Sequence, residues 1–98
     1  MRLRWEADAI ADLLELRAYI QQDNPGAAKR VVRKILATVK RLKEQPMLGR
    51  SGRVHGTREL VISATPYTVA YHVTPDTVTV LRVLHQAREW PKRVPPSH

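Results

Sequence analysis

Four basic side chains in the second half of the sequence are of types that could do chemistry: Arg58, Arg82, His85 and Arg88. If they converge at one end of a sheet, His85 could act as a general acid in RNA cleavage, because the ordinary pKa of histidine is about 6.5. The arginines would then stabilise the negative charge of the phosphorane. The alternative is that His85, at the end of a strand, only forms a hydrogen bond.

Arg82 stands out because it is a charge in a segment rich in Val and Leu. An arginine is costly to bury unpaired, so Arg82 is expected to pair with a carboxylate, such as Glu59 or Glu89, or to face a groove that a ligand uses. Glu59 follows Arg58 directly and therefore lies on the opposite face of its strand. The sequence thus leaves open whether all four basic residues form one cluster.

Two further features could bind a partner. Trp90, followed by Pro91, is expected to pack over the sheet edge and close the domain, and stacking on a base is the alternative. The second feature is a basic surface on residues 25–44, formed by Lys29, Arg30, Arg33, Lys34, Lys40, Arg41 and Lys43. The simplest interpretation of that surface is a solvated helix face.

Other constellations that support catalysis or metal binding are missing from the sequence. There is no cysteine, which excludes disulfides and thiolate metal sites, and the four histidines lack zinc-site spacing. No serine lies in a nucleophile elbow. Residues 45–56 are rich in Gly and basic residues but lack the ending of a P-loop, so they are expected to form a mobile connector. The sequence therefore predicts no metal and no cofactor.

Three consecutive strands are predicted to position these side chains. Residues 57–63, 67–74 and 77–84 are rich in Val, Ile, Leu, Tyr and Thr, and the short breaks between them contain Pro66 and Pro75. Connections this short join antiparallel neighbours, so we expect a meander. Strict alternation would place positions 78, 80, 82 and 84 on one face of the last strand and positions 79, 81, 83 and 85 on the other. Both faces are largely apolar, which predicts a central strand.

The first half of the sequence predicts one strand and two helices. Residues 1–5 alternate apolar and basic side chains, as an edge strand does. Apolar residues recur at helical spacing over residues 7–22, and Asn24 and Pro25 are typical of the N-cap and first position of a second helix, over residues 25–44. The predicted fold class is α+β, with the order β-α-α-β-β-β and a helical hairpin packed on a small, mainly antiparallel sheet.

Length and charge limit the class of protein. The chain has 98 residues, which fits one domain over residues 1–91 followed by a flexible tail over residues 92–98. Its formal net charge of +8 favours an acidic partner, either nucleic acid or an acidic protein segment. No apolar run approaches the roughly 18 residues that span a bilayer. We therefore expect a soluble protein with no membrane partner, and because the absence of cysteine is compatible with a reducing cytosol, the expected location is cytoplasmic.

The element order and three segments together resemble the RelE/ParE superfamily of bacterial toxin–antitoxin toxins. These segments are GTRELV in residues 56–61, PYTVAY in residues 66–71 and RVLHQAREWP in residues 82–91, and the resemblance covers residues 1 to about 91. It implies a small toxin encoded beside a cognate antitoxin, whose C-terminal segment wraps and neutralises the toxin.

The superfamily contains two activities, and the resemblance is closer to the ParE branch. RelE-like members cut mRNA on the ribosome with basic residues on the middle strands, an arginine after the first Tyr of the third strand and often a C-terminal Tyr. In this sequence the corresponding positions hold Glu59, Val61 and Thr68. ParE-like members inhibit DNA gyrase by binding, so the resemblance implies gyrase as target and requires no catalytic side chain.

Three alternatives for function follow from the sequence. Under the favoured one, the residues expected to contact gyrase or the antitoxin are Arg58, Tyr67, Arg82, His85, Arg88 and Trp90. Under the second, the protein is a ribosome-dependent mRNA endoribonuclease, and Arg82, His85 and Arg88 are its catalytic residues. The third is a basic nucleic-acid-binding module without toxicity.

Overall fold

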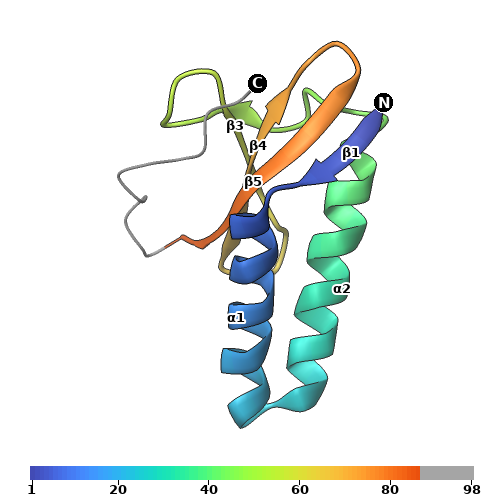
Figure 1. Ribbon diagram of the computed structural model, residues 1–98. Coiled ribbons are helices and arrows are strands. Elements are labelled where there is room, and N and C mark those ends of the chain that lie inside the picture. Colours follow the sequence, from blue (N-terminus) through green and yellow to red (C-terminus); the bar gives the residue numbers. More distant parts are fainter. Residues whose placement is uncertain (87–98) are drawn as a thin grey trace.

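In the computed structural model, which describes residues 1–86, the first half of the chain forms the expected helical hairpin (Figure 1). α1 spans Ala7–Asp23 and α2 spans Pro25–Arg41. The Asn24 side chain accepts a hydrogen bond from the backbone N–H of Ala27 at 3.0 Å, as an N-cap does. α2 ends at Arg41, earlier than expected, and the chain continues in a turn.

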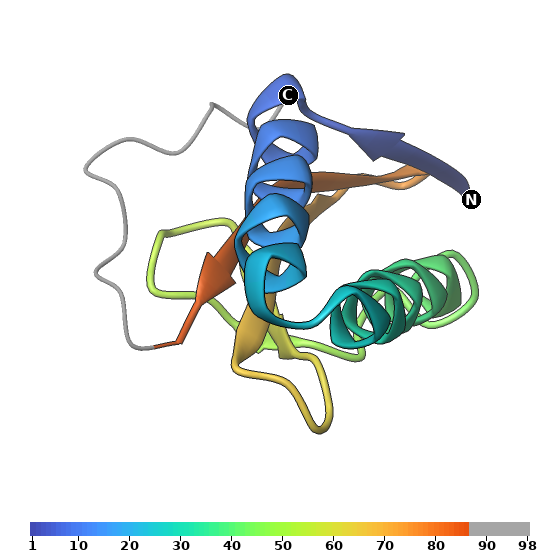
Figure 2. The same cartoon turned by 90° about the horizontal axis from the view of Figure 1, so that it is seen from below.

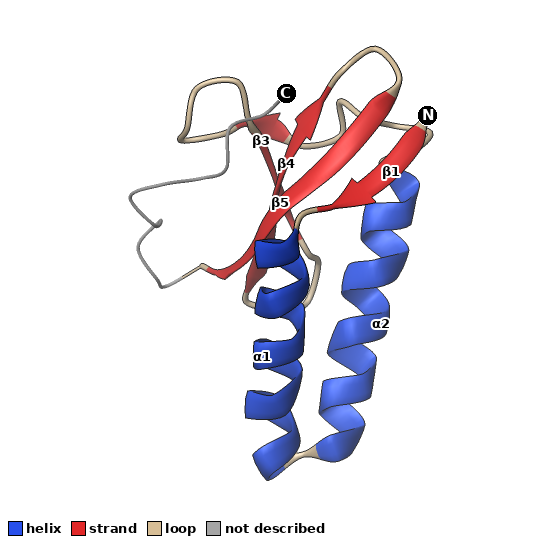
Figure 3. Ribbon diagram, in the orientation of Figure 1, coloured by secondary structure: helices blue, strands red, loops and turns tan. Residues whose placement is uncertain are grey.

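The sheet has five strands in the order β1-β5-β4-β3-β2 (Figure 3). Their bounds are Arg2–Trp5 for β1, Arg50–Ser51 for β2, Arg58–Val61 for β3, Tyr67–Val73 for β4 and Thr77–His85 for β5. β3, β4 and β5 form the expected antiparallel meander, and β1 lies at the edge, parallel to β5. β5 is thus flanked by a strand on each side, as its apolar faces predicted.

A β-bulge in β5 changes which side chains share a face. Ala70 pairs with Arg82 and Tyr71 pairs with Val80, so Leu81 is the extra residue in the ladder. The expected strict alternation is therefore wrong for this strand. Val80 lies on the same face as Val83, and Arg82 lies on the other.

The helices cover the face of the sheet to which Val80 and Val83 belong. The buried cluster between the two layers contains Ala9, Leu16, Ile35, Val39, Leu42, Ile62, Tyr67, Val69, Tyr71, Val78, Val80 and Val83. The loop between β2 and β3 lies on the opposite side of β4 and β5 from α2 (Figure 2). The sheet is therefore the middle layer, between the helices and this loop.

The segment from residue 45 to 56, expected to be a mobile connector, is instead anchored at several points. It contains β2, which pairs with β3. The fully buried Tyr71 hydroxyl accepts a hydrogen bond from the Gly49 N–H and donates one to the Pro46 carbonyl, both at 2.8 Å. A side chain at Gly49 would stand 2.7 Å from that hydroxyl, so the close approach requires glycine.

Candidate functional site

The expected site residues are distributed along the meander instead of gathering at one end. Tyr67 pairs with His85, and their rings meet edge to face with centroids 5.5 Å apart. Arg58 pairs with Tyr71, and the step from Tyr67 to Tyr71 spans about 13 Å of strand. Arg58 therefore does not join His85. Arg88 and Trp90 lie outside the described residues.

Arg82 is held by Asp12 of α1. The Nε atom of Arg82 donates to Asp12 Oδ2 at 2.7 Å, and a terminal guanidinium nitrogen donates to Oδ1 at 2.9 Å. The side chains of Arg82 and Asp12 are 20% and 13% exposed, so the pair is largely withdrawn from water. The hydrogen bonds to Asp12, which outweigh the opposing effect of burial, raise the pKa of Arg82 above its ordinary value. The expectation that Arg82 pairs with a carboxylate is thus confirmed, but the carboxylate is Asp12 and not Glu59, and the other named candidate, Glu89, lies outside the described residues.

Asp12 also completes the edge of the sheet. β1 pairs with β5 only as far as Val80, and beyond that point α1 runs past the uncovered edge of β5. The backbone N–H of Val83 donates to Asp12 Oδ2 at 2.9 Å, so the carboxylate takes the place of a missing strand partner. The Asp12 carboxylate thus accepts hydrogen bonds from the Arg82 guanidinium and from the Val83 N–H, and these bonds fix α1 against β5.

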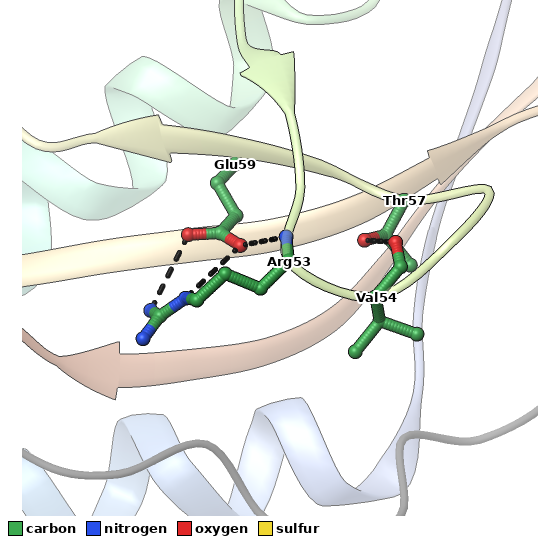
Figure 4. Close-up of polar contacts among 4 residues, drawn as sticks. All are labelled: Arg53, Val54, Thr57 and Glu59. Atoms are coloured by element: carbon green, nitrogen blue, oxygen red, sulfur yellow. Dashed lines mark hydrogen bonds and ion pairs between the residues drawn. The ribbon is translucent and has the colours of Figure 1, made fainter.

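Glu59 is buried and has a different partner. Its side chain is 3% exposed and accepts the backbone N–H of Arg53 at 2.7 Å. The guanidinium of Arg53 points toward the same carboxylate, with contacts of 3.4 Å from Nε and 3.3 Å from a terminal nitrogen (Figure 4). The Thr57 hydroxyl donates to the Val54 carbonyl in the same loop. Glu59 therefore holds the loop between β2 and β3 over the face of the sheet that the helices do not cover.

Arg58 fixes the segment that precedes β2. A terminal nitrogen of its guanidinium donates to the Gly49 carbonyl at 2.7 Å, next to the hydrogen bond that Tyr71 accepts from the Gly49 N–H. Burial is the main cause that raises the pKa of Tyr71, so this hydroxyl stays protonated. Both side chains position the backbone, and neither geometry indicates catalysis.

Glu59 and His72 lie on the face of the sheet opposite the helices and are of types that could exchange a proton, but both are bonded to the loop between β2 and β3. Glu59 is bonded to Arg53, and His72 is bonded through Nδ1 to the Gly56 carbonyl at 3.0 Å. Register places Val61 of β3 opposite Thr68 of β4, and Glu59 opposite Ala70. Val61 is 49% exposed and Thr68 is buried. The three positions that the resemblance aligns with basic residues of RelE-like members thus hold a buried carboxylate at Glu59, an isopropyl group at Val61 and a hydroxyl group at Thr68.

Two residues that shape this region were missed by the sequence analysis. Asp12 was not among the candidate partners of Arg82, since nothing in the sequence links it to a strand far along the chain. Tyr71 was not among the candidate site residues, because its bonds to Pro46 and Gly49 depend on how the loop folds back. The glycine at position 49 was the only available signal of close backbone approach.

Within residues 1–86 no group of three or more His, Asp or Glu side chains is arranged to hold a metal ion. In the same part of the chain, neither helix has the length and apolar character to cross a membrane.

Comparison with known proteins decides the family. The family model for the ParE toxin of the type II toxin–antitoxin system, parDE, matches residues 3–90. The chain belongs to the ParE toxin family. The toxin is 44% identical over 91 residues to the putative toxin Y4kP of Sinorhizobium fredii, covering 93% of this chain and 94% of that protein. It is 37% identical over 84 residues to the toxin RelE2 of Caulobacter vibrioides, covering 86% and 93% of the two chains.

Solved structures agree with this assignment. The toxin superposes on a chain of the chromosomal ParDE toxin–antitoxin system from P. aeruginosa with a TM-score of 0.79 and 27% identity, covering 87% of this chain and 95% of the other. The YoeB dimer from Staphylococcus aureus shares the fold, with a TM-score of 0.55, 17% identity and coverage of 84% and 92%. The expected RelE/ParE fold is thus confirmed. Membership of a toxin–antitoxin family implies a cognate antitoxin as the partner of this toxin.

Proposed function

We propose that this toxin inhibits DNA gyrase by binding it, without a catalytic side chain. The proposal rests mainly on the bonding of Arg82, the candidate catalytic arginine. Its Nε atom and one of its terminal nitrogens both donate hydrogen bonds to Asp12. A guanidinium in this geometry stabilises α1 against β5 and is not presented to a phosphate. Val61 and Thr68 add support, because neither can act as a general base at neutral pH.

The comparisons support the same branch. The matching family is described as ParE, and the P. aeruginosa chain that superposes over most of this toxin comes from a ParDE system. A ParE-like target would be reached through surface contacts. We propose His85, together with Arg88 and Trp90, for target or antitoxin binding, whereas Tyr67 is buried and would support the His85 ring.

The second candidate function is ribosome-dependent mRNA cleavage. Two observations favour it: one relative carries the name toxin RelE2, and His85 lies against the Tyr67 ring, where a histidine could be oriented for proton transfer. Under this alternative His85 acts as the acid, and Arg82 must leave Asp12 when RNA binds.

Purified toxin tests the two functions side by side. One assay measures gyrase supercoiling and the accumulation of cleaved DNA, and the other measures cleavage of mRNA on programmed ribosomes. We expect gyrase inhibition with stabilised DNA breaks, relieved by the cognate antitoxin, and intact mRNA. Codon-dependent mRNA cuts that disappear in His85→Ala, with gyrase unaffected, would establish the endoribonuclease instead.

A further inference from the structure

A groove lies between α2 and the turn that joins β3 to β4, away from the residues discussed above. Its volume is about 680 Å³, and the turn that forms its second wall lies beside α2 (Figure 2). The lining residues are Ala27, Arg30, Val31, Arg33, Lys34, Ala64 and Thr65. Positions 27, 30, 31 and 34 share one face of a helix, so α2 presents a continuous strip to the groove.

The wall opposite α2 is held in a fixed shape. Ala64 has a φ of 61°, a left-handed conformation that a non-glycine residue adopts only when its surroundings impose it. The Thr65 hydroxyl donates to the Ile62 carbonyl at 2.9 Å and accepts the Tyr67 N–H at 3.2 Å. These bonds fix the turn that forms this wall of the groove.

The charges around the groove have one sign. Arg30, Arg33 and Lys34 are exposed, and none of them has a carboxylate partner within residues 1–86. Residues 25–41, which make up α2, contain no Asp or Glu. Three cations surrounding a cavity without a counter-charge give it a positive potential, which attracts an acidic ligand.

The apolar part of the lining limits the class of ligand that fits the groove. Ala27, Val31 and Ala64 contribute apolar side chains to the same lining as the three cations. A nucleic-acid backbone would use the cations alone, whereas a peptide with aliphatic side chains among Asp and Glu would use both the charge and the apolar surface. The combination fits an acidic, partly apolar protein segment.

We propose that this groove binds an acidic segment of the cognate antitoxin, with one or two aliphatic side chains on Val31 and carboxylates on Arg30, Arg33 and Lys34. The inference follows from family membership and from the groove itself, and it is independent of the target that the toxin inhibits. Under this proposal α2 takes part in the neutralisation of the toxin by its antitoxin. The simplest interpretation of the sequence had been that the basic surface of this helix is only a solvated face.

A pair of charge reversals in the groove tests the proposal. Arg30→Glu with Lys34→Glu reverses two lining cations, and Lys29→Glu with Lys40→Glu makes the same change of net charge on α2 outside the groove. Titration calorimetry with purified full-length antitoxin at low salt should show about tenfold weaker binding for the groove variant and a change below about threefold for the control. All four positions are exposed, so both variants should unfold at the temperature of the wild-type toxin.

Three outcomes would overturn the proposal. Unchanged antitoxin affinity in the groove variant would show that the groove is not used. Equal weakening in both variants would show a response to net charge alone. Retained antitoxin affinity with loss of binding to a short DNA duplex, measured by fluorescence anisotropy, would assign the groove to nucleic acid. None of these assays contains gyrase, so a failure of the gyrase proposal leaves their outcome unaffected.

Discussion

Removing the guanidinium of Arg82 tests whether this side chain has a structural role. In Arg82→Met the apolar stem is kept, while the two bonds to Asp12, at 2.7 and 2.9 Å, are lost. Breaking a buried ion pair costs about 3–5 kcal/mol, and the partial exposure of Arg82 and Asp12 reduces this to about 2–3 kcal/mol of unfolding free energy. For a domain of this size the melting temperature should fall by roughly 10–20 °C. Urea and thermal unfolding measure both quantities.

Asp12→Ala should be more destabilising than Arg82→Met, because it also removes the acceptor of the Val83 N–H. The double variant should be less destabilised than the sum of the two, with a coupling energy of about 1–2 kcal/mol. The matched control is Arg4→Met, which removes the exposed contact with Glu6 at 3.9 Å and should cost less than about 0.5 kcal/mol.

The reasoning would be refuted by a stable Arg82→Met variant. If its unfolding free energy lay within about 0.5 kcal/mol of the wild-type value, the pair with Asp12 would contribute little in solution. If such a stable variant also lost inhibition of the target, Arg82 would be a binding or catalytic residue. A destabilised variant that keeps full inhibition at low temperature would confirm the structural role.

Three further changes have defined outcomes. Tyr71→Phe should lower the unfolding free energy by about 1–3 kcal/mol, because the Gly49 N–H and the Pro46 carbonyl lose their partner. Since burial raises the pKa of Tyr71 in the folded state, the wild type should lose stability as the pH rises above about 10, and urea titrations should show a smaller loss in the variant. Gly49→Ala should cost about 1–3 kcal/mol, because its Cβ would stand 2.8 Å from the Glu59 carbonyl, and a variant as stable as wild type would contradict the packing. Asn24→Ala should cost about 1 kcal/mol in thermal unfolding and Asn24→Asp much less, whereas equal losses would argue against the cap.

Local signals in the sequence were sufficient for most of the fold. Asn24 and Pro25 marked the start of α2 because capping depends on neighbouring residues only. The meander followed from the composition of its strands and the short turns between them. β2 was missed because Arg50 and Ser51 are both exposed, and a strand of this length has no apolar alternation to detect.

The site was less predictable because its contacts join distant parts of the chain. The bulge at Leu81 shifts the phase of β5 and cannot be deduced from a run of Val, Leu and Thr, which is compatible with either face. Asp12 and Arg82 meet only because α1 crosses the edge of β5 beyond the end of β1. The sequence correctly indicated that Arg82 needs a partner, and only the tertiary arrangement shows which one.

The pairing of β1 with β5 has a consequence for the newly synthesised toxin. Arg2 pairs with Thr77, so β1 has no neighbour in the sheet until β5 has been synthesised. Local contacts allow the helical hairpin to form early, whereas this long-range pairing closes late. A nascent chain interrupted before Thr77 therefore has no β5, cannot bury the inner face of β4 and exposes apolar surface to chaperones and proteases. Incomplete translation should yield degraded fragments and no active toxin.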